Sequence, residues 1–498
     1  MRLGLLAAQA GFALPTGADT QVTGFAIDNR KVAPGTVFGA FQGAVVNGED
    51  FIPAAIAAGA VAVVARPEAH EAIELGGAVH IADPNPRRAF ALLAAGFFTP
   101  VPETIVAVTG TNGKTSCVEM TRQIWRMGGE RSASIGTLGV TTADESISTG
   151  LTTPDIVTFL ANMSGLAREG VSHVAYEASS HGLSQYRNEG LKVMAAAFTN
   201  LSRDHLDYHS DMDDYFAAKM RLYDEVVDAA GTAVIWADDE WSAKAIGHAE
   251  KRGLRVLTVG EKAEVQGSSI RLLARTPTQL GQTLEIEFAG DRRKLNLPLI
   301  GAYQAANALV SAGLVLATGG DPAQVFDALS RLQPVRGRIE RAAISRAGAP
   351  VYVDYAHTPD ALEAAIAALR PHCSGRLIVV FGAGGDRDPG KRAPMGQVVA
   401  QQADLGIVTD DNPRGEDPAA IRAMVMAGGP GVLRDGGERR AAIAAAIAEA
   451  GRDDIVLIAG KGHEQGQIMG AGEQCRVLPF DDVTVARESA APPGRDNA

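Results

Sequence analysis

Residues 103–116 read ETIVAVTGTNGKTS, and this stretch decides the fold. It opens with the apolar run Ile105-Val106-Ala107-Val108, which is typical of a parallel strand buried on both faces. The segment Gly110-Thr111-Asn112-Gly113-Lys114-Thr115 is then expected to turn the chain into a helix that begins near Ser116. Such a turn directs free backbone N–H groups and the positive end of a helix at phosphate oxygens. We expect Lys114 to reach the outer phosphates and the Thr115 hydroxyl to bind Mg²⁺.

The spacing of this loop departs from the strict P-loop pattern. That pattern places a glycine where this chain has Val108, so the loop is a shortened variant. The alternative interpretation is a tight strand-to-helix turn that carries two glycines for structural reasons alone. Gly-Lys-Thr after an apolar strand is more specific than glycine alone, which favours phosphate binding.

The bulk composition describes an ordinary globular protein. At 498 residues the chain is too long for one hydrophobic core, and about three domains are expected. The net charge of −12 argues against a nucleic-acid surface. Cys117, Cys373 and Cys475 lack the spacing of a disulfide framework or a zinc site, which fits a reducing compartment.

No targeting or membrane segment is predicted. The sequence has no uncharged apolar run of about 18 residues, the length that a membrane span needs. Residues 1–15 are largely apolar but lack a clear signal-peptide cleavage site. We therefore predict a cytoplasmic, monomeric enzyme with no membrane or nucleic-acid partner.

Changes of pattern divide the chain into three predicted α/β domains. Residues 1–97 form an N-terminal α/β substrate domain, 98–334 a central doubly wound P-loop ATPase domain, and 335–498 a C-terminal Rossmann-like domain. Pro100 and Pro102 mark the first linker. No glycine fingerprint follows the first strand of the last domain, so NAD binding is not predicted there. The tail 489–498 is expected to be disordered.

The central domain carries an acid–histidine–lysine set at predicted strand ends. Glu177 closes the apolar segment 171–177, and the next strand end delivers His205 and His209, with Lys219 one short helix later. Carboxylate and hydroxyl oxygens beside a phosphate loop suit Mg²⁺. The alternative is a zinc site or a set of solvated loop histidines, drawn from His173, His181, His205 and His209.

Four predicted strands of the C-terminal domain end in polar turns. The expected strands are Val351–Asp354, Leu377–Phe381, Leu405–Thr409 and Ile455–Ala459, and the expected helices are Pro359–Leu369 and Arg439–Ala450. Because parallel strands share one carboxyl edge, the four turns are expected to form one rim. Its polar side chains would suit a ligand with carboxylates and an ammonium group; they are Arg387, Asn412, Arg414 and Glu464.

Taken together, these motifs are similar to the Mur ligases of bacterial cell-wall synthesis. The resemblance covers nearly the whole chain, in matching order, and rests on Gly110–Ser116, Glu177–His181, Asn200–His209, Val335–Glu340, Asp354–Asp360, Asp411–Arg414 and Gly460–Glu464. It implies an ATP- and Mg²⁺-dependent amide ligase that works through an acyl phosphate. The substrates it implies are UDP-N-acetylmuramoyl-L-alanyl-D-glutamate and meso-diaminopimelate.

The resemblance also implies roles for individual residues. Catalysis would fall to Lys114, Glu177, His205 and Lys219, and metal binding to Thr115, Glu177, His205 and Lys219 as its carbamate. The nucleotide would contact Gly110, Thr111, Asn112, Gly113, Lys114, Thr115, Asn307, Arg338 and Asp354. The nucleotide-linked peptide would contact Asn29, Thr152, Thr153, Ser179, Gln185 and Arg187. The amino acid would contact Arg387, Asp411, Asn412, Arg414, Gly460 and Glu464.

Two positions depart from the pattern of the family. Asn29 stands where Asp-Ser-Arg is common, so the uridine contact of that serine is replaced or lost. The Gly-x-x-x-Asn helix start reads Gly301-Ala302-Tyr303-Gln304 here, which leaves Asn307 as the surviving amide.

Specificity for the amino acid is predicted from Asp411-Asn412-Pro413-Arg414. Family members that use lysine carry other residues at the arginine position. Arg414 would pair with the distal carboxylate of meso-diaminopimelate, which lysine lacks. A buried guanidinium left unpaired costs on the order of 3–5 kcal/mol, which corresponds to at least about a hundredfold discrimination.

Three alternative functions remain at this point. A lysine-adding homologue and a folylpolyglutamate synthase-like ligase share the loop, although the second would not explain Arg414 together with Glu464. A non-catalytic P-loop regulator belongs to a different class. It would bind nucleotide without amino-acid-dependent phosphate release.

Overall fold

The computed structural model describes residues 1–14, 17–43, 46–74, 76–147, 152–204, 208–264, 269–278 and 280–491. The chain divides into two compact units. One comprises Met1–Arg271 with Leu309–Val325, and the other Leu272–Ala308 with Phe326–Ala498. None of the helices in the described ranges combines the length and apolar character that a bilayer crossing requires.

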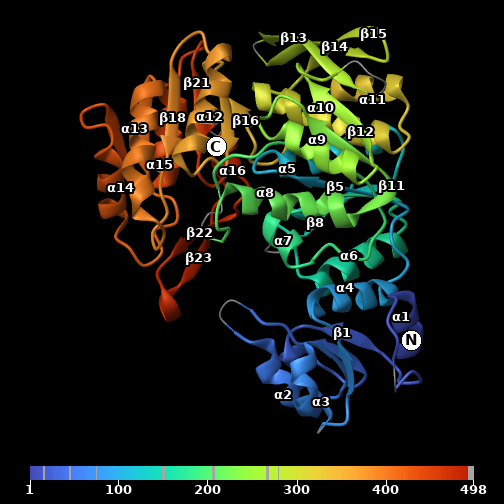
Figure 1. The fold of residues 1–498 in the computed structure, drawn as a ribbon. Coiled ribbons are helices and arrows are strands. Elements are labelled where there is room, and N and C mark those ends of the chain that lie inside the picture. Colours follow the sequence, from blue (N-terminus) through green and yellow to red (C-terminus); the bar gives the residue numbers. More distant parts are fainter. Residues whose placement is uncertain are drawn as a thin grey trace, which may run out of the picture. The chain divides into compact units, whose positions relative to one another are not determined.

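The N-terminal part of the chain forms a four-stranded parallel sheet in the order β1-β2-β3-β4 (Figure 1). Its strands are β1 (Gly24–Ala26), β2 (Thr36–Gly39), β3 (Ala60–Ala65) and β4 (Val79–Ala82). Its helices are α1 (Leu3–Gln9), α2 (Ile52–Ala57), α3 (His70–Glu74) and α4 (Pro86–Phe97). The apolar start of the chain is therefore core: Leu3 and Leu6 on α1 are fully buried in the same cluster as Phe90 on α4.

The middle of the chain builds an eleven-stranded sheet from its described residues, in the order β15-β14-β13-β12-β11-β10-β5-β9-β6-β7-β8. The strands are β5 (Thr104–Thr109), β6 (Ser132–Gly136), β7 (Gly139–Thr141), β8 (Ser146–Ile147), β9 (His173–Glu177), β10 (Val193–Phe198), β11 (Val227–Trp236), β12 (Arg255–Gly260), β13 (Ile270–Thr278), β14 (Gly281–Phe288) and β15 (Asp291–Leu297). The helices are α5 (Lys114–Met127), α6 (Ile156–Arg168), α7 (Ser180–Ser184), α8 (Met212–Arg221), α9 (Ser242–Lys251), α10 (Ala302–Ala317) and α11 (Pro322–Leu329). Strands β6, β9, β5, β10, β11 and β12 are parallel neighbours, as expected of a P-loop domain.

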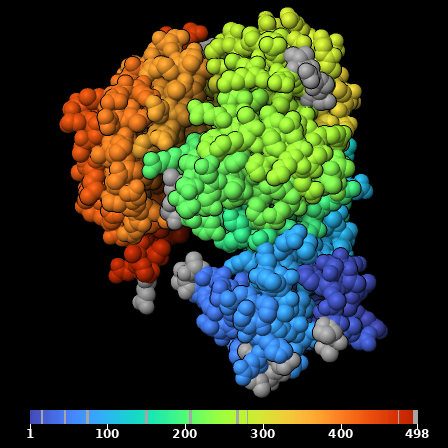
Figure 2. Space-filling model, in the orientation of Figure 1, coloured from blue at the N-terminus to red at the C-terminus, as the bar shows by residue number. Residues whose placement is uncertain are grey.

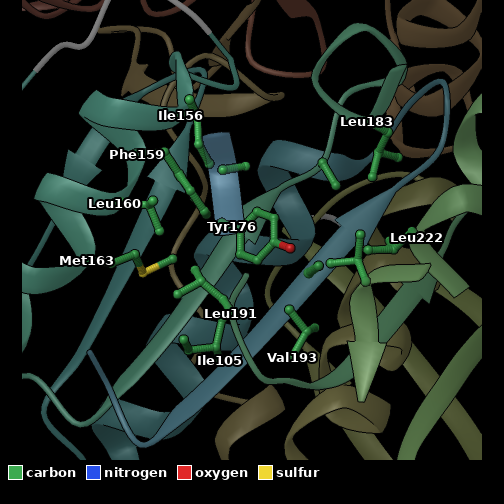
Figure 3. Packing of buried hydrophobic residues seen from close by; sticks show 14 of the residues in the cluster. Ile105, Ile156, Phe159, Leu160, Met163, Tyr176, Leu183, Leu191, Val193 and Leu222 are labelled. Atoms are coloured by element: carbon green, nitrogen blue, oxygen red, sulfur yellow. The ribbon is translucent and has the colours of Figure 1, made fainter. Parts of the chain in front are cut away.

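Strand β5 lies at the centre of this sheet, and every one of its residues is buried. Figure 3 shows part of the core around it, in which Ile105 of β5 and Tyr176 of β9 belong to the same apolar cluster as Phe159 of α6. The Phe159 and Tyr176 rings pack edge to face, with centroids 5.0 Å apart. Burial on both faces explains why the sequence shows an apolar run there rather than an alternating pattern.

The C-terminal part of the chain has a six-stranded sheet in the order β16-β17-β21-β18-β19-β20. Its strands are β16 (Glu340–Ile344), β17 (Pro350–Asp354), β18 (Leu377–Phe381), β19 (Leu405–Thr409), β20 (Leu433–Gly437) and β21 (Ile455–Ala459). The helices are α12 (Pro359–Leu369), α13 (Arg392–Gln402), α14 (Pro418–Met426), α15 (Arg439–Glu449) and α16 (Asp482–Ala490), and a hairpin pairs β22 (Gly466–Met469) with β23 (Arg476–Pro479).

Two separate apolar cores show that this sheet is doubly wound. One core contains Leu362 of α12, Met395 of α13 and Val425 of α14, and the other contains Ile443 of α15 and Val483 of α16. The hairpin projects from this part of the chain and is the group of red atoms below the orange ones in Figure 2.

Two expectations about local structure were wrong. Helix α5 begins at Lys114 rather than near Ser116, because Gly113 adopts a left-handed conformation (φ 87°) and ends the loop two residues earlier than expected. Ser489 and Ala490 of the predicted disordered tail belong to α16, whose Val483, Val485 and Ala486 are buried. Residues 492–498 lie outside the described ranges.

Candidate active site

The phosphate-binding loop leaves the carboxyl end of β5 and enters α5. Gly110 has φ 145°, and a Cβ at this position would collide with the Thr199 side chain. Thr199 Oγ1 in turn donates to the Asn112 carbonyl (2.6 Å), and the Asn112 N–H donates to Asn200 Oδ1 (2.9 Å). The end of β10 therefore holds the loop open at the amino end of α5, the geometry that anion binding requires.

Two lysines converge on this loop. Lys114 Nζ donates to the Gly110 and Thr111 carbonyls (2.9 and 2.8 Å), and Lys219 Nζ of α8 donates to the same Gly110 carbonyl (2.8 Å). Lys219 is 1% exposed and lies 4.3 Å from the centre of the Tyr215 ring. Its burial, together with the nearby Lys114 cation, lowers the pKa of Lys219 well below the ordinary value.

Glu177 ends β9 directly beside β5, in register with Val108. Its carboxylate accepts from the Thr137 N–H (2.7 Å) and the Thr137 hydroxyl (3.2 Å). Gly136 leaves the space for this carboxylate, because a Cβ there would overlap it. Thr115 is buried at the start of α5. The loop, Glu177 and Lys219 thus lie at one edge of one sheet.

The residues predicted for the nucleotide-linked peptide form a network next to Glu177. Thr152 Oγ1 contacts Thr137 Oγ1 (3.0 Å), and Thr153 Oγ1 donates to the Glu177 carbonyl (2.8 Å) and contacts Ser179 Oγ (3.0 Å). Arg187 donates to the Thr153 carbonyl (2.9 Å) and to Gln185 Oε1 (2.7 Å). All five predicted residues, Thr152, Thr153, Ser179, Gln185 and Arg187, are therefore brought together.

Of the other predicted residues, one lies in the N-terminal part of the chain and one falls outside the described ranges. Asn29 belongs to a short 3₁₀ turn, Asn29–Lys31, in the N-terminal part of the chain. The preceding Asp28 accepts hydrogen bonds from Arg30, which lower the pKa of the Asp28 carboxyl to about 2. His205 lies outside the described residues.

The zinc alternative finds no support in the described part of the chain, where no three His, Cys, Asp or Glu side chains are grouped to hold a metal ion. His173 lies at the opposite end of β9 from Glu177. His209 is 4% exposed and packs on the Tyr215 ring, with centroids 5.1 Å apart.

Asn307, Arg338 and Asp354, predicted to contact the nucleotide, are linked within the other unit. Asp354 ends β17 and accepts from the Ile339 and Ala356 N–H groups (2.8 Å each). Burial raises the pKa of the Asp354 carboxyl, and the Arg338 cation opposes that rise. Gln304, the departure from the family pattern, donates to the Arg338 carbonyl (2.8 Å), and Asn307 Nδ2 donates to Gln304 Oε1 (3.4 Å).

The four polar turns of the C-terminal sheet share one edge, as expected, because β17, β21, β18 and β19 are parallel neighbours. The turns approach one another closely at glycine positions. A Cβ at Gly385 would overlap the Pro413 carbonyl, and one at Gly460 (φ 122°) would lie 2.6 Å from Asp411 Oδ2. Arg387 is exposed in the first of these glycine-rich turns. Glycine is thus required here by close approach as well as by conformation.

Asn412, Glu464 and Lys461 form a compact polar cluster within this rim. Asn412 Nδ2 donates to Glu464 Oε2 (2.9 Å), and Lys461 Nζ donates to Asn412 Oδ1 (2.7 Å) and Glu464 Oε2 (3.3 Å). Asp411 Oδ2 is buried and has no hydrogen-bond partner among the described residues. Arg414, in a left-handed conformation (φ 51°), donates from Nη1 to the Gly385 carbonyl (2.8 Å). The rim therefore offers carboxylate acceptors beside a guanidinium.

Sequence reasoning missed several residues that hold these side chains. Thr137 and Thr199 position Glu177 and the loop, but isolated threonines at loop positions carry no signal in one sequence. Lys461 lies inside the quoted Gly460–Glu464 motif, and its place between two glycines was the available signal. Arg439, fully buried on α15, had no signal because arginine is usually exposed.

Comparison with known proteins shows that three parts of the chain match models of one protein family. The family described as "Mur ligase family, catalytic domain" matches residues 21–98, "Mur ligase middle domain" matches 108–315, and "Mur ligase, glutamate ligase domain" matches 337–462.

Two curated relatives match nearly the whole chain. It is 60% identical over 488 residues to a UDP-N-acetylmuramoyl-L-alanyl-D-glutamate–2,6-diaminopimelate ligase of Zymomonas mobilis, covering 98% of each protein. It is 52% identical over 468 residues to the protein of the same name from Bradyrhizobium diazoefficiens, covering 94% of each.

A solved structure agrees with these relatives. The structure of a UDP-N-acetylmuramoyl-L-alanyl-D-glutamate–2,6-diaminopimelate ligase aligns with a TM-score of 0.74 at 31% identity, covering 98% of both chains. With three matched domains and relatives of this identity along nearly its full length, the chain belongs to the Mur ligase family.

Proposed function

We propose that this protein is an ATP-dependent amide ligase that adds meso-diaminopimelate to UDP-N-acetylmuramoyl-L-alanyl-D-glutamate, in peptidoglycan precursor synthesis. The observation that carries the proposal is the 60% identity over 488 residues to a ligase of that name. The described geometry supports it, because a phosphate loop with two lysines and a rim with acidic and guanidinium groups are the parts such a reaction needs.

The reaction proceeds in two displacements. The γ-carboxylate of the bound dipeptide attacks the γ-phosphorus of ATP, so that ADP leaves and an acyl phosphate forms. The free amine of diaminopimelate then attacks the acyl carbon, and phosphate leaves as the amide forms. Lys114 and the backbone N–H groups at the start of α5 stabilise the charge that develops on the transferred phosphoryl group.

Oxygen donors beside the loop fit Mg²⁺. The Thr115 hydroxyl and the Glu177 carboxylate are hard ligands, and two protein ligands suit an ion that keeps waters and phosphate oxygens in its shell. When bound there, Mg²⁺ neutralises charge on the phosphates. Lys219 is proposed to hold a second ion as its carbamate, with His205. The lowered pKa of Lys219 supports this, since carbamate formation needs the neutral amine.

The remaining predicted residues keep their proposed roles. Thr152, Thr153, Ser179, Gln185 and Arg187 bind the dipeptide end of the nucleotide-linked substrate, and Asn29 its uridine end. Asn307, Arg338 and Asp354 contact the nucleotide. These roles rest on the family resemblance together with the hydrogen-bond networks described above.

The amino acid binds at the C-terminal rim. Asp411 Oδ2, a buried acceptor without a partner in the described residues, and Glu464 receive the ammonium group. Arg414 and Arg387 donate to the carboxylates, where a guanidinium binds two oxygens at once. Lysine lacks the distal carboxylate, so we propose that the rim selects diaminopimelate.

We also propose a monomer that works in the cytoplasm. The support for this location is that ATP and a nucleotide-linked precursor are cytoplasmic substrates, and that Cys117, Cys373 and Cys475 are free thiols.

The test is phosphate release by the purified protein with ATP, Mg²⁺, the nucleotide-linked dipeptide and either diaminopimelate or lysine. We expect faster release with diaminopimelate than with lysine, because lysine has no distal carboxylate for the half-buried Arg414 guanidinium to bind. Release with lysine alone would assign the lysine-adding activity. Nucleotide binding without any amino-acid-dependent release would indicate a regulator.

A further inference from the structure

Lys461 is one of the most deeply buried charged side chains in the C-terminal part of the chain. It is 0% exposed, and its Nζ donates to three acceptors: Asn412 Oδ1 (2.7 Å), the Gly466 carbonyl (2.7 Å) and Glu464 Oε2 (3.3 Å). These three bonds use all three N–H groups of an ammonium. A buried ammonium is costly, and a hydrophobic side chain of similar length would avoid that cost. A lysine at position 461 is therefore explained by the roles of the three groups that accept its hydrogen bonds.

The first consequence is a fixed orientation for the Asn412 amide. Its Oδ1 accepts from Lys461 Nζ and from the Ile468 N–H (2.9 Å), so the oxygen must face these two donors. The amide nitrogen is thereby directed at Glu464 Oε2, to which it donates (2.9 Å). Lys461 thus decides which end of the Asn412 amide faces the carboxylate.

The second consequence concerns the Glu464 carboxylate, which is 33% exposed. Its Oε2 is shared between Asn412 Nδ2 and Lys461 Nζ, which orients the group from the buried side. Oε1 is then left to accept from a ligand on the exposed side. A carboxylate held in this way is preorganised to receive an ammonium group.

The third consequence reaches Arg414 through the hairpin. Lys461 fixes the Gly466 carbonyl at the start of β22, and this strand and the residue after it bond Arg414: the Arg414 N–H donates to the Ile468 carbonyl (3.0 Å), and the Gly470 N–H donates to the Arg414 carbonyl (2.7 Å). The backbone that presents the guanidinium is thus anchored to the same buried nitrogen.

From this geometry we propose that Lys461 is a positioning residue for the amino-acid substrate: it holds Asn412, Glu464 and the β22 strand that bonds the backbone of Arg414 in the arrangement that recognises the ammonium and carboxylate groups of a diamino dicarboxylic acid. The inference rests on the proposed function and adds a residue that touches no reacting atom itself.

The test is the variant Lys461→Met, assayed by phosphate release and by binding of diaminopimelate in calorimetry. Loss of hydrogen bonds from a charged donor costs about 1.5–3 kcal/mol, so we expect the KM for diaminopimelate to rise by about 10- to 100-fold. The KM for ATP and for the nucleotide-linked dipeptide should stay within about twofold, since their proposed residues make no contact with Lys461.

A matched control separates this role from loss of stability. Asp454 is also buried and accepts from the Arg376 N–H (2.7 Å) and the Gly451 N–H (2.9 Å), at the amino edge of the same sheet. Asp454→Asn should lower the melting temperature without changing the KM for diaminopimelate. A selective rise in that KM with Lys461→Met and not with Asp454→Asn supports the proposal.

The proposal for Lys461 would be overturned if Lys461→Met and the wild type had equal KM values for diaminopimelate. It would also be overturned if the KM values for all three substrates rose equally in the variant. If Lys461→Met does not fold, Lys461→Gln, which keeps two N–H donors, takes its place with the same expected selectivity. A wild-type protein that releases no phosphate with diaminopimelate would instead refute the proposed function.

Discussion

At the scale of single residues, the specificity of the rim depends on Arg414. Its backbone is left-handed, its guanidinium is anchored by the Gly385 carbonyl, and its strand partner is Met469. We predict that Arg414→Ala reduces the kcat/KM for diaminopimelate by at least about a hundredfold. The variant removes the guanidinium that is proposed to bind both oxygens of the distal carboxylate. Steady-state kinetics with each substrate varied in turn will measure it.

The control for this variant is Arg440→Ala, in which an exposed guanidinium of the same part of the chain is removed from its ion pair with Glu488. Its kinetics should match the wild type. If Arg414→Ala weakened the use of ATP and of diaminopimelate equally, the assignment of Arg414 to the amino acid would be wrong.

Site residues that belong to a sequence motif could be predicted from the sequence. Residues that belong to the site only through a contact in the folded chain could not. Lys114 and Glu177 stand at recognisable strand ends, so a single sequence locates them. Thr137 holds Glu177 from 40 positions away, and Thr199 reaches Asn112 from 87 positions away. Such partners are set by the register of neighbouring strands, which one sequence does not reveal.

At the scale of elements, helices α15 and α16 are joined by a fully buried ion pair. Arg439 and Asp482 are both 0% exposed, with Nη2 and Oδ2 2.7 Å apart, and Arg439 also donates to the Ala459 carbonyl (3.0 Å) at the end of β21. We predict that Asp482→Ala lowers the free energy of unfolding by about 3–5 kcal/mol, since it leaves a buried guanidinium uncompensated. Chemical denaturation will measure this loss.

The same two helices provide the comparison. Arg440 and Glu488 pair on the exposed side of α15 and α16, with side chains 54% and 56% exposed. Glu488→Ala should change the free energy of unfolding by no more than about 1 kcal/mol. Similar losses for the two variants would show that burial does not decide the strength of these pairs.

Elements differed in how well the sequence predicted them. The helix Pro359–Leu369 has the predicted bounds, because Thr358 caps it and Pro359 occupies its first turn. The strands Leu377–Phe381 and Ile455–Ala459 also agree, since burial on both faces leaves continuous apolar runs. The hairpin of β22 and β23 was missed, as Gly466–Met469 is only half-buried and Arg476–Pro479 is exposed.

At the scale of the whole molecule, buried histidines make stability depend on pH. Burial lowers the pKa of His173 and His372, and it lowers the pKa of His463 to about 4, where Arg338 and Arg336 add to the effect. In the unfolded chain these imidazoles have pKa values near 6.5. Below about pH 6.5 the unfolded state therefore binds more protons than the folded one, and stability falls as pH falls toward about 4.

We predict that the free energy of unfolding drops steadily between about pH 6.5 and about pH 4, as measured by urea denaturation across that range. The variant His463→Gln should flatten this dependence, because glutamine binds no proton. An unchanged slope in the variant would show that His463 does not contribute to the loss in acid.

The three α/β domains were predictable because alternating strands and helices are a long-range pattern that survives local errors. The contacts that make the C-terminal rim depend instead on glycines whose neighbours come from other turns. Gly385 lies against the Pro413 carbonyl, and Gly460 lies against Asp411. A glycine in a sequence shows where the backbone is free, but not what approaches it.

The close approach of these turns at Gly385 and Gly460 bears on inhibitor resistance. A compound that mimics the transition state and fills the rim would press against the main chain at Gly385 and Gly460, where any added side chain collides with the protein itself. Escape mutations would then fall on the side chains proposed to bind the amino acid, and each of them would also impair turnover of the natural substrate; they are Arg387, Asp411, Asn412, Arg414 and Glu464.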